Sequence, residues 1–159
     1  MSNSDHQPSP AHISHSPIDL QDCGLAALSA LIGDRWTLLV LRSLFYGVSR
    51  FADIKADIGI PGSTLSDRLK RLLSAGIIEE RPYREANART RAAYGITHKG
   101  NSLRIVLMTM MQWGDTHLLK QAAPLIPVSR KTEEPLRLAY VTAADRAVDE
   151  QDVRFVLRK

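Results

Sequence analysis

Apolar residues in the first third of the chain recur every three or four positions, which is typical of amphipathic helices. The pattern predicts a first helix over Leu20–Ile32, ended by Gly33. Asp34 is a favoured N-cap residue, so a second helix is expected to begin there and to close at Gly47. A third, shorter helix is predicted from about Arg50 to Ile58. The start of the chain is therefore expected to be entirely helical.

The segment Gly59–Gly62 interrupts this pattern because two glycines and a proline break a helix. A fourth helix is predicted after it, with Ser63 or Thr64 as the N-cap and Gly76 as the end. Leucines at helical spacing give this helix one buried stripe: Leu65, Leu69, Leu72 and Leu73. Two helices joined by such a turn predict a helix-turn-helix unit.

Two β-prone runs follow, Ile77–Tyr83 and Arg91–Ile96, and they predict a hairpin. The loop between them carries Arg84 and Arg89. Thr97 is then expected to cap a long final helix that reaches about Ala122. Helix-turn-helix, hairpin and closing helix, in this order, can lay one helix in a DNA major groove with a wing beside it.

The apolar residues of the final helix cover more than one face: Leu103, Val106, Leu107, Met110, Met111, Trp113 and Leu118. A helix that is apolar beyond one stripe usually has two surfaces to pack against. One is expected to be its own domain, and the other a second copy of the chain.

The two ends of the chain differ from this central part. Residues 1–18 are rich in Ser, Pro and His, which predicts a disordered tail. Residues 19–122 are expected to form a DNA-binding and dimerisation domain. Residues 123–159 form a C-terminal extension, in which Leu136–Thr142 and Val153–Leu157 predict a β-hairpin. The predicted fold class is mainly α with a small β-hairpin wing, an α+β winged helix-turn-helix.

The charge distribution supports contact with phosphates. The net charge is +4, but residues 1–49 carry 2 basic and 4 acidic side chains, whereas residues 50–100 carry 10 and 6. The positive excess thus lies on the predicted helix-turn-helix and hairpin. A solvated basic face is the alternative explanation of the same pattern.

Composition and motifs exclude several other classes. The apolar runs are far shorter than the roughly 20 residues that span a bilayer, and the N-terminus lacks the features of a signal peptide. The cytoplasm is therefore the expected location, without membrane contact. The one cysteine excludes an intrachain disulfide. Phosphate-loop, dinucleotide-binding, HExxH and nucleophile-elbow motifs are absent, so neither an enzyme nor a cofactor is expected.

Three histidines in the N-terminal tail, His6, His12 and His15, are the best candidates for a metal cluster. A flexible tail has no fixed geometry, and neither thiolate nor carboxylate ligands accompany them. No metal site is expected.

Motifs spread over nearly 100 residues point to one family: Cys23, Gly33-Asp34-Arg35-Trp36-Thr37, Arg50-Phe51, Leu65-Ser66-Asp67-Arg68-Leu69, Ala75-Gly76-Ile77, Tyr94, Ile96-Thr97, Gly100 and Trp113-Gly114. With them, the chain from Cys23 to Leu118 resembles the HxlR-type winged helix-turn-helix regulators, which are related to the MarR-type regulators. The resemblance implies a homodimer, built from the first and last helices of the core, that binds an operator.

The resemblance also implies a recognition helix at Ser63–Ser74 and a wing at Arg81–Arg91. The candidate DNA-binding residues are Ser63, Thr64, Ser66, Asp67, Arg68, Lys70, Arg71, Arg84, Arg89 and Arg91. Arg68 and Arg71 are suited to reading a guanine edge, although phosphate contact or simple solvation is the commoner role of such arginines. For Thr64 and Ser66, phosphate contact is favoured. At the hairpin tip, DNA contact is favoured over a tip that only keeps the protein soluble.

Six residues are candidates for dimer contacts: Leu25, Leu28, Leu107, Met110, Met111 and Trp113. Cys23 lies at the start of the first helix, where the helix dipole favours a thiolate, and matching cysteines in some family members sense oxidants. A small buried core residue is the favoured alternative for Cys23.

The sequence as a whole predicts a DNA-binding transcriptional regulator, and a repressor that binds a palindromic operator as a homodimer is the favoured form. One alternative is a receptor in which a small-molecule effector or thiol chemistry at the dimer interface controls DNA release. Another is a winged helix used only for protein contacts.

Overall fold

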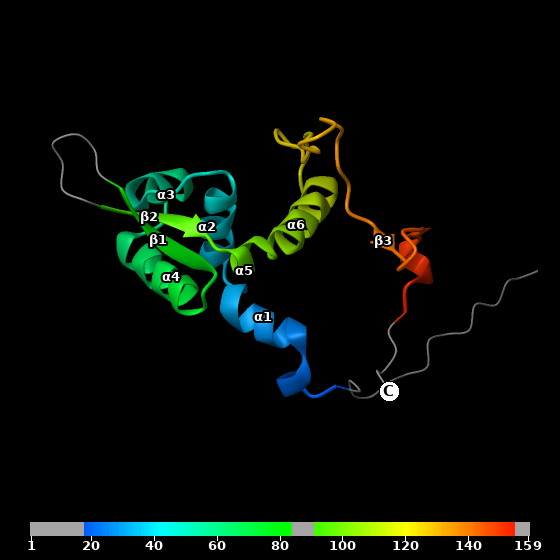
Figure 1. Cartoon of the computed structure of the whole chain (residues 1–159), viewed down its shortest axis with the longest axis horizontal. Coiled ribbons are helices and arrows are strands. Elements are labelled where there is room, and N and C mark those ends of the chain that lie inside the picture. Colours follow the sequence, from blue (N-terminus) through cyan, green and yellow to red (C-terminus); the bar gives the residue numbers. More distant parts are fainter. Residues whose placement is uncertain (1–17, 84–90, 155–159) are drawn as a thin grey trace, which may run out of the picture.

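A computed structural model describes residues 18–83 and 91–154 of the chain. Its elements in chain order are η1 (Leu20–Asp22), α1 (Gly24–Ile32), α2 (Arg35–Phe45), α3 (Phe51–Ile58), α4 (Gly62–Ser74), β1 (Ile78–Tyr83), β2 (Arg91–Ile96), α5 (His98–Asn101), α6 (Arg104–His117), β3 (Tyr140–Val141), β4 (Ala147–Val148) and η2 (Glu150–Asp152). Helices α2, α3 and α4 gather around the β1–β2 hairpin, whereas α1 and α6 lead away from this body (Figure 1). The predicted fold class, mainly α with a small hairpin, is confirmed.

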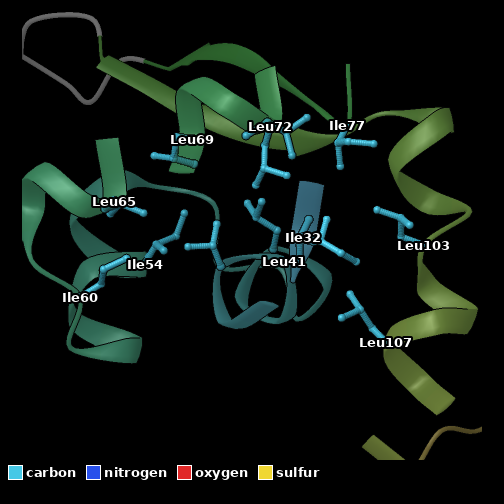
Figure 2. Packing of buried hydrophobic residues seen from close by; sticks show 13 residues of the cluster. Ile32, Leu41, Ile54, Ile60, Leu65, Leu69, Leu72, Ile77, Leu103 and Leu107 are labelled. Atoms are coloured by element: carbon cyan, nitrogen blue, oxygen red, sulfur yellow. The ribbon is translucent and has the colours of Figure 1, made fainter. Parts of the chain in front are cut away.

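The hydrophobic core lies where α2, α3 and α4 meet. Leu41, Ile54 and Leu65, one from each of these helices, have no exposed surface. Leucines of α4 point toward α2 and α3, while Leu103 and Leu107 close the opposite side of the core (Figure 2). The leucine stripe predicted for the fourth helix is therefore the surface that α4 buries.

Two of the three predicted N-caps are confirmed, and the third is wrong. Asp34 Oδ1 accepts hydrogen bonds from the backbone N–H groups of Trp36 and Thr37, both at 3.1 Å, and so caps α2. Thr97 caps α5. The predicted cap of α4 at Ser63 or Thr64 does not form, because Pro61 ends the turn in an extended conformation and α4 already begins at Gly62.

The turn between α3 and α4 follows the prediction. Gly59 has a φ of +66°, a conformation that favours glycine, and it ends α3. The chain then passes through Ile60, which is buried, and Pro61, the N-cap residue of α4. Gly59, the buried Ile60 and Pro61 thus form the turn that leads into α4.

The long final helix is in fact two helices. Thr97 Oγ1 accepts from the N–H of Gly100 at 3.0 Å and caps the short α5. A Cβ atom at Gly100 would collide with the carbonyl oxygen of Ile77, so α5 packs directly on the base of the hairpin. The chain then changes direction, and α6 runs only from Arg104 to His117, short of the predicted Ala122.

The predicted first helix is also divided. A 3₁₀ turn covers Leu20–Asp22, and α1 begins only after Cys23, which has extended backbone angles. Cys23 is therefore the N-cap residue of α1.

The predicted hairpin is confirmed in its two strands. Strands β1 and β2 pair antiparallel, from Ile78 opposite Ile96 to Tyr83 opposite Arg91. The N–H of Tyr94 also donates to the carbonyl oxygen of Ser49 at 2.8 Å, which ties the hairpin to the α2–α3 connection.

The C-terminal extension contains a hairpin, but not the predicted one. β3 pairs with β4, so that Tyr140 lies opposite Val148. Asp145, with a φ of +57°, turns the chain back at once, and its N–H donates to the carbonyl oxygen of Thr142 at 2.9 Å. The second strand was predicted at Val153–Leu157, but Val153 follows η2 outside any strand. Residues 155–157 lie outside the described part of the chain.

In the described ranges, no single helix has the length and apolar character needed to cross a membrane. The pair α1 and α2 meets these criteria together, but with a bend of 82° between its members.

Candidate nucleic-acid interface

Helix α4 presents one polar face to solvent. Its exposed residues are Ser63, Asp67, Lys70, Arg71 and Ser74. These positions fall on one side of a helix with 3.6 residues per turn, opposite the buried leucines. Thr64 and Ser66, both half-buried, flank this face. The exposed polar face of α4 thus brings together most of the residues predicted to contact DNA on this helix.

Arg68 lies on the flank of α4 and is engaged within the protein. Its Nε donates to Asp34 Oδ1 at 2.8 Å, and only 24% of its side chain is exposed. The same carboxylate caps α2 and accepts from the Thr37 hydroxyl at 2.6 Å. Burial by itself would raise the pKa of Asp34, but hydrogen bonds from Thr37 and Arg68 outweigh burial and lower it from 3.8 to about 2.

Arg71 is likewise attached to the neighbouring helices. Its Nη2 donates to the carbonyl oxygen of Ala30 at 2.8 Å, and its Nη1 lies 4.0 Å from Asp34 Oδ2. Its side chain remains 46% exposed. Arg68 and Arg71 therefore hold α4 against the end of α1 and the start of α2. That either of them reads a guanine stays a prediction.

Helix α3 is fastened to α2 through Asp57. Arg42 Nη2 lies 3.1 Å from Asp57 Oδ2, and the Ser43 hydroxyl donates to the same oxygen. The hydrogen bond from Ser43 is the main cause that lowers the pKa of Asp57, and the Arg42 guanidinium adds to it against the opposing effect of burial. Sequence reasoning missed this pair, since no local pattern connects residues on two different helices.

The hairpin is joined to the end of α4. Thr97 Oγ1 donates to the carbonyl oxygen of Gly76 at 2.7 Å, and Lys99 Nζ donates to that of Ala75 at 2.8 Å. The C-terminal end of α4 and the residues that follow β2 are thus held together. Lys99 was not among the predicted functional residues, although a cation near a helix C-terminus is a recognised signal.

The wing arginines are only partly described. Arg81 pairs with Glu79 on the same strand at 2.8 Å and lies against Gly95, which leaves room for its guanidinium. The backbone of Arg91 belongs to β2. Arg84 and Arg89, the predicted tip contacts, lie outside the described residues.

The predicted dimer contacts divide into exposed and buried residues. Leu25, Met110 and Trp113 expose 76%, 49% and 59% of their surface. Leu107 is a core residue with 7% exposure, and the half-buried Leu28 packs against the same core. Their burial within one protomer leaves these two side chains little surface for a partner.

Two predicted residues remain, the dimer candidate Met111 and the possible redox sensor Cys23. The half-buried Met111 faces Tyr46, whose hydroxyl lies 3.9 Å from its sulfur. Cys23 is half-buried at the N-cap of α1 and is absent from the core cluster. The favoured expectation of a buried core cysteine is therefore wrong.

Metal ligands do not cluster in residues 18–83 and 91–154: no group of three or more His, Cys, Asp or Glu side chains could hold an ion there. The tail histidines His6, His12 and His15 lie outside the described residues.

The HxlR-like helix-turn-helix profile matches residues 31–122, from the end of α1 to just beyond α6. The chain belongs to this family. The family assignment confirms the resemblance found in the sequence, and residues 31–122 accordingly form an HxlR-like helix-turn-helix domain.

Curated relatives carry matching descriptions. An uncharacterised HTH-type transcriptional regulator of Mycobacterium tuberculosis, Rv3095, is 39% identical over 102 residues, which cover 64% of this chain and 63% of the relative. The chain thus spans less than two thirds of that relative's length. The HTH-type transcriptional regulator YodB of Bacillus subtilis is 33% identical over 87 residues, covering 54% of this chain and 76% of YodB.

Two solved structures resemble most of the chain. PA1607, a candidate transcription factor, superposes with a TM-score of 0.72 at 26% identity and covers 84% of this chain and 94% of its own. A candidate transcription factor of Pseudomonas aeruginosa, PA1374, gives a TM-score of 0.58 at 28% identity, with 86% and 92% covered. The match to PA1607 covers 84% of 159 residues, or about 134. Because residues 1–122 are fewer than that, the match must include part of the C-terminal extension.

Proposed function

We propose that this HxlR-family protein is a cytoplasmic repressor that binds a palindromic operator as a homodimer. The exposed polar face of α4, supported beside the hairpin, is the observation that carries this proposal. In a winged helix such a face enters the major groove, and the wing arginines Arg84, Arg89 and Arg91 meet the adjacent backbone.

The surfaces of α1 and α6 support the proposed dimer. Leu25 on α1 and Met110 and Trp113 on α6 are large apolar side chains that one protomer leaves exposed. Both helices lead away from the core (Figure 1). A second copy would bury these side chains and present two recognition helices, which matches a palindromic site.

The rival use of the winged helix, for protein contacts alone, has less support. The residues that α4 exposes include no large apolar side chain, whereas a protein-docking face is expected to be more apolar.

Selection of bound fragments from genomic DNA with the purified full chain tests the proposal. We expect palindromic sites with half-sites about one helical turn apart. Binding should weaken with salt on a log–log slope steeper than about −3, because two copies each neutralise several phosphates. A monomer on a single asymmetric site with a flat salt response would contradict the proposal. Insertion of the selected site into a promoter then distinguishes repression from activation.

A further inference from the structure

A groove of about 710 Å³ lies between α2, α6 and the C-terminal extension. Its apolar walls include Phe45, Leu107, Met108, Leu125, Ile126 and Leu136. The extension is attached across it, because the N–H of Leu138 donates to Gln112 Oε1 on α6 at 3.0 Å. This volume is in the usual range of small-molecule sites.

The charged residues of the groove have an excess of positive charge. Arg42, Arg104 and Arg137 line it, against the single carboxylate of Asp115. The guanidinium of Arg104 is held over the ring of Phe45, 4.9 Å from its centroid. Apolar walls with an excess of guanidinium groups are complementary to a molecule with an apolar body and an anionic head.

We propose that this groove binds an aliphatic monocarboxylate, with its chain among the apolar walls and its carboxylate at the arginines. Leucine, isoleucine and methionine side chains form most of the apolar lining. Such side chains suit a flexible alkyl chain better than a flat ring, because methionine adapts its shape to fill irregular gaps. In this proposal the small-molecule effector binds within one protomer, and not at the dimer interface that the sequence suggested as an alternative.

Arg42 connects the groove to the helix-turn-helix unit. It lines the groove and also pairs with Asp57 in the last turn of α3, directly before the turn into α4. Its Nε is buried and has no hydrogen-bond partner among the described residues. A carboxylate in the groove competes with Asp57 for this guanidinium, so its binding loosens α3 and weakens operator binding. This coupling rests on the proposed function.

Calorimetric titration of the full chain with decanoate, below its micelle concentration, tests the site without DNA. We expect one decanoate per chain and at least tenfold weaker binding of decylammonium, which has the same chain length and the opposite charge. Arg104→Gln and Arg137→Gln should each weaken decanoate binding at least fivefold. Arg146→Gln, an exposed arginine of the same extension outside the groove, is the matched control.

The site would be refuted if decanoate showed no saturable binding, for example because a partner copy occupies the groove. Equal binding of decanoate and decylammonium would also refute it, as would equal losses of decanoate affinity in Arg137→Gln and Arg146→Gln. Met108→Trp, which narrows the groove with a bulkier side chain, should weaken decanoate binding at least fivefold in a folded protein. Unchanged binding in that variant would also overturn the assignment.

Operator titrations with and without decanoate test the coupling. Decanoate should weaken operator binding at least fivefold in the wild type, but less than twofold in Asp57→Asn, where Arg42 no longer has a carboxylate partner to exchange. Unchanged operator affinity of the wild type at saturating decanoate would refute the coupling. If the chain selects no DNA, the proposed function fails, and the decanoate titration still decides the site.

Discussion

Arg68 donates from Nε to Asp34 Oδ1 at 2.8 Å and so joins the recognition helix to the cap of α2. One carboxylate serves two purposes here, since Asp34 also satisfies the N–H groups of Trp36 and Thr37. The pair adds a polar contact to the leucine packing that places α4 on the core. Arg68 therefore helps to position α4, and a DNA contact through its other N–H groups would not require breaking this pair.

The first prediction concerns the stability that this pair contributes. Asp34→Asn should lower the free energy of unfolding at pH 7 by about 1–2 kcal/mol, a value discounted because 32% of the Asp34 side chain is exposed. Asparagine is itself a good N-cap, so the loss reflects the charge and its pairing with Arg68. Urea unfolding measures it. Asp67→Asn, at an exposed position on α4, is the control and should change stability by less than about 0.5 kcal/mol.

The pH dependence of stability has a definite sign. The folded pKa of Asp34, about 2, is below its ordinary value of 3.8. Its contribution is therefore complete above about pH 4 and is lost as the pH falls from about 4 to about 2. The difference in unfolding free energy between wild type and Asp34→Asn should shrink over this interval. A constant difference would show that the carboxylate charge is not responsible.

The second prediction separates DNA contact from positioning. Lys70→Ala, on the exposed polar face of α4, should weaken operator binding, reduce the salt slope by about 1 per subunit and leave the melting temperature unchanged. Arg68→Ala should lower the melting temperature. Lys131→Ala, an exposed lysine in the extension, is the control for net charge. If Lys70→Ala binds like wild type while Arg68→Ala relaxes preference at one base position, Arg68 is the reader after all.

The third prediction locates the dimer interface. Met110→Asp places a carboxylate on the exposed apolar surface of α6, where a partner would leave it buried and unpaired. Sedimentation should show folded monomers, because Met110 is 49% exposed and is not needed by the protomer core. Ala52→Asp, at an exposed position of α3, should stay dimeric. An intact Met110→Asp dimer would move the interface to another surface. Leu107→Asp is unsuited to this test, since Leu107 is buried in its own protomer.

The fourth prediction concerns Cys23. Because it is half-buried at a helix N-cap rather than in the core, its thiol should react with an aromatic disulfide reagent in the folded protein. Absorbance of the released thiolate measures the reaction, with Cys23→Ser as the blank. A disulfide formed by diamide would have to join two chains, since the sequence holds one cysteine. A thiol that reacts only after unfolding would place Cys23 under a partner subunit.

Several local features could be predicted because short-range chemistry decides them. Asp34 caps α2 as expected, since its carboxylate lies next to the N–H groups that it satisfies. The leucine stripe of α4 and the two strands of the hairpin also follow from the residue pattern. The predictions were wrong where distant segments meet: the predicted final helix is interrupted at Ser102 and Leu103, directly after the turn in which Gly100 packs against the backbone of Ile77.

In the candidate site, too, local features could be predicted, whereas contacts between distant segments could not. Spacing alone placed a polar face on the helix from Ser63 to Ser74, and composition alone placed basic residues along it and the hairpin. Which arginines remain available depended on tertiary contacts, because Arg68 and Arg71 meet partners more than 30 residues away in sequence. The groove under the extension has the same origin, since α2, α6 and the residues after Ala123 are adjacent only in the folded chain. The sequence determined which local elements form, and tertiary packing decided which of their side chains remain free to bind.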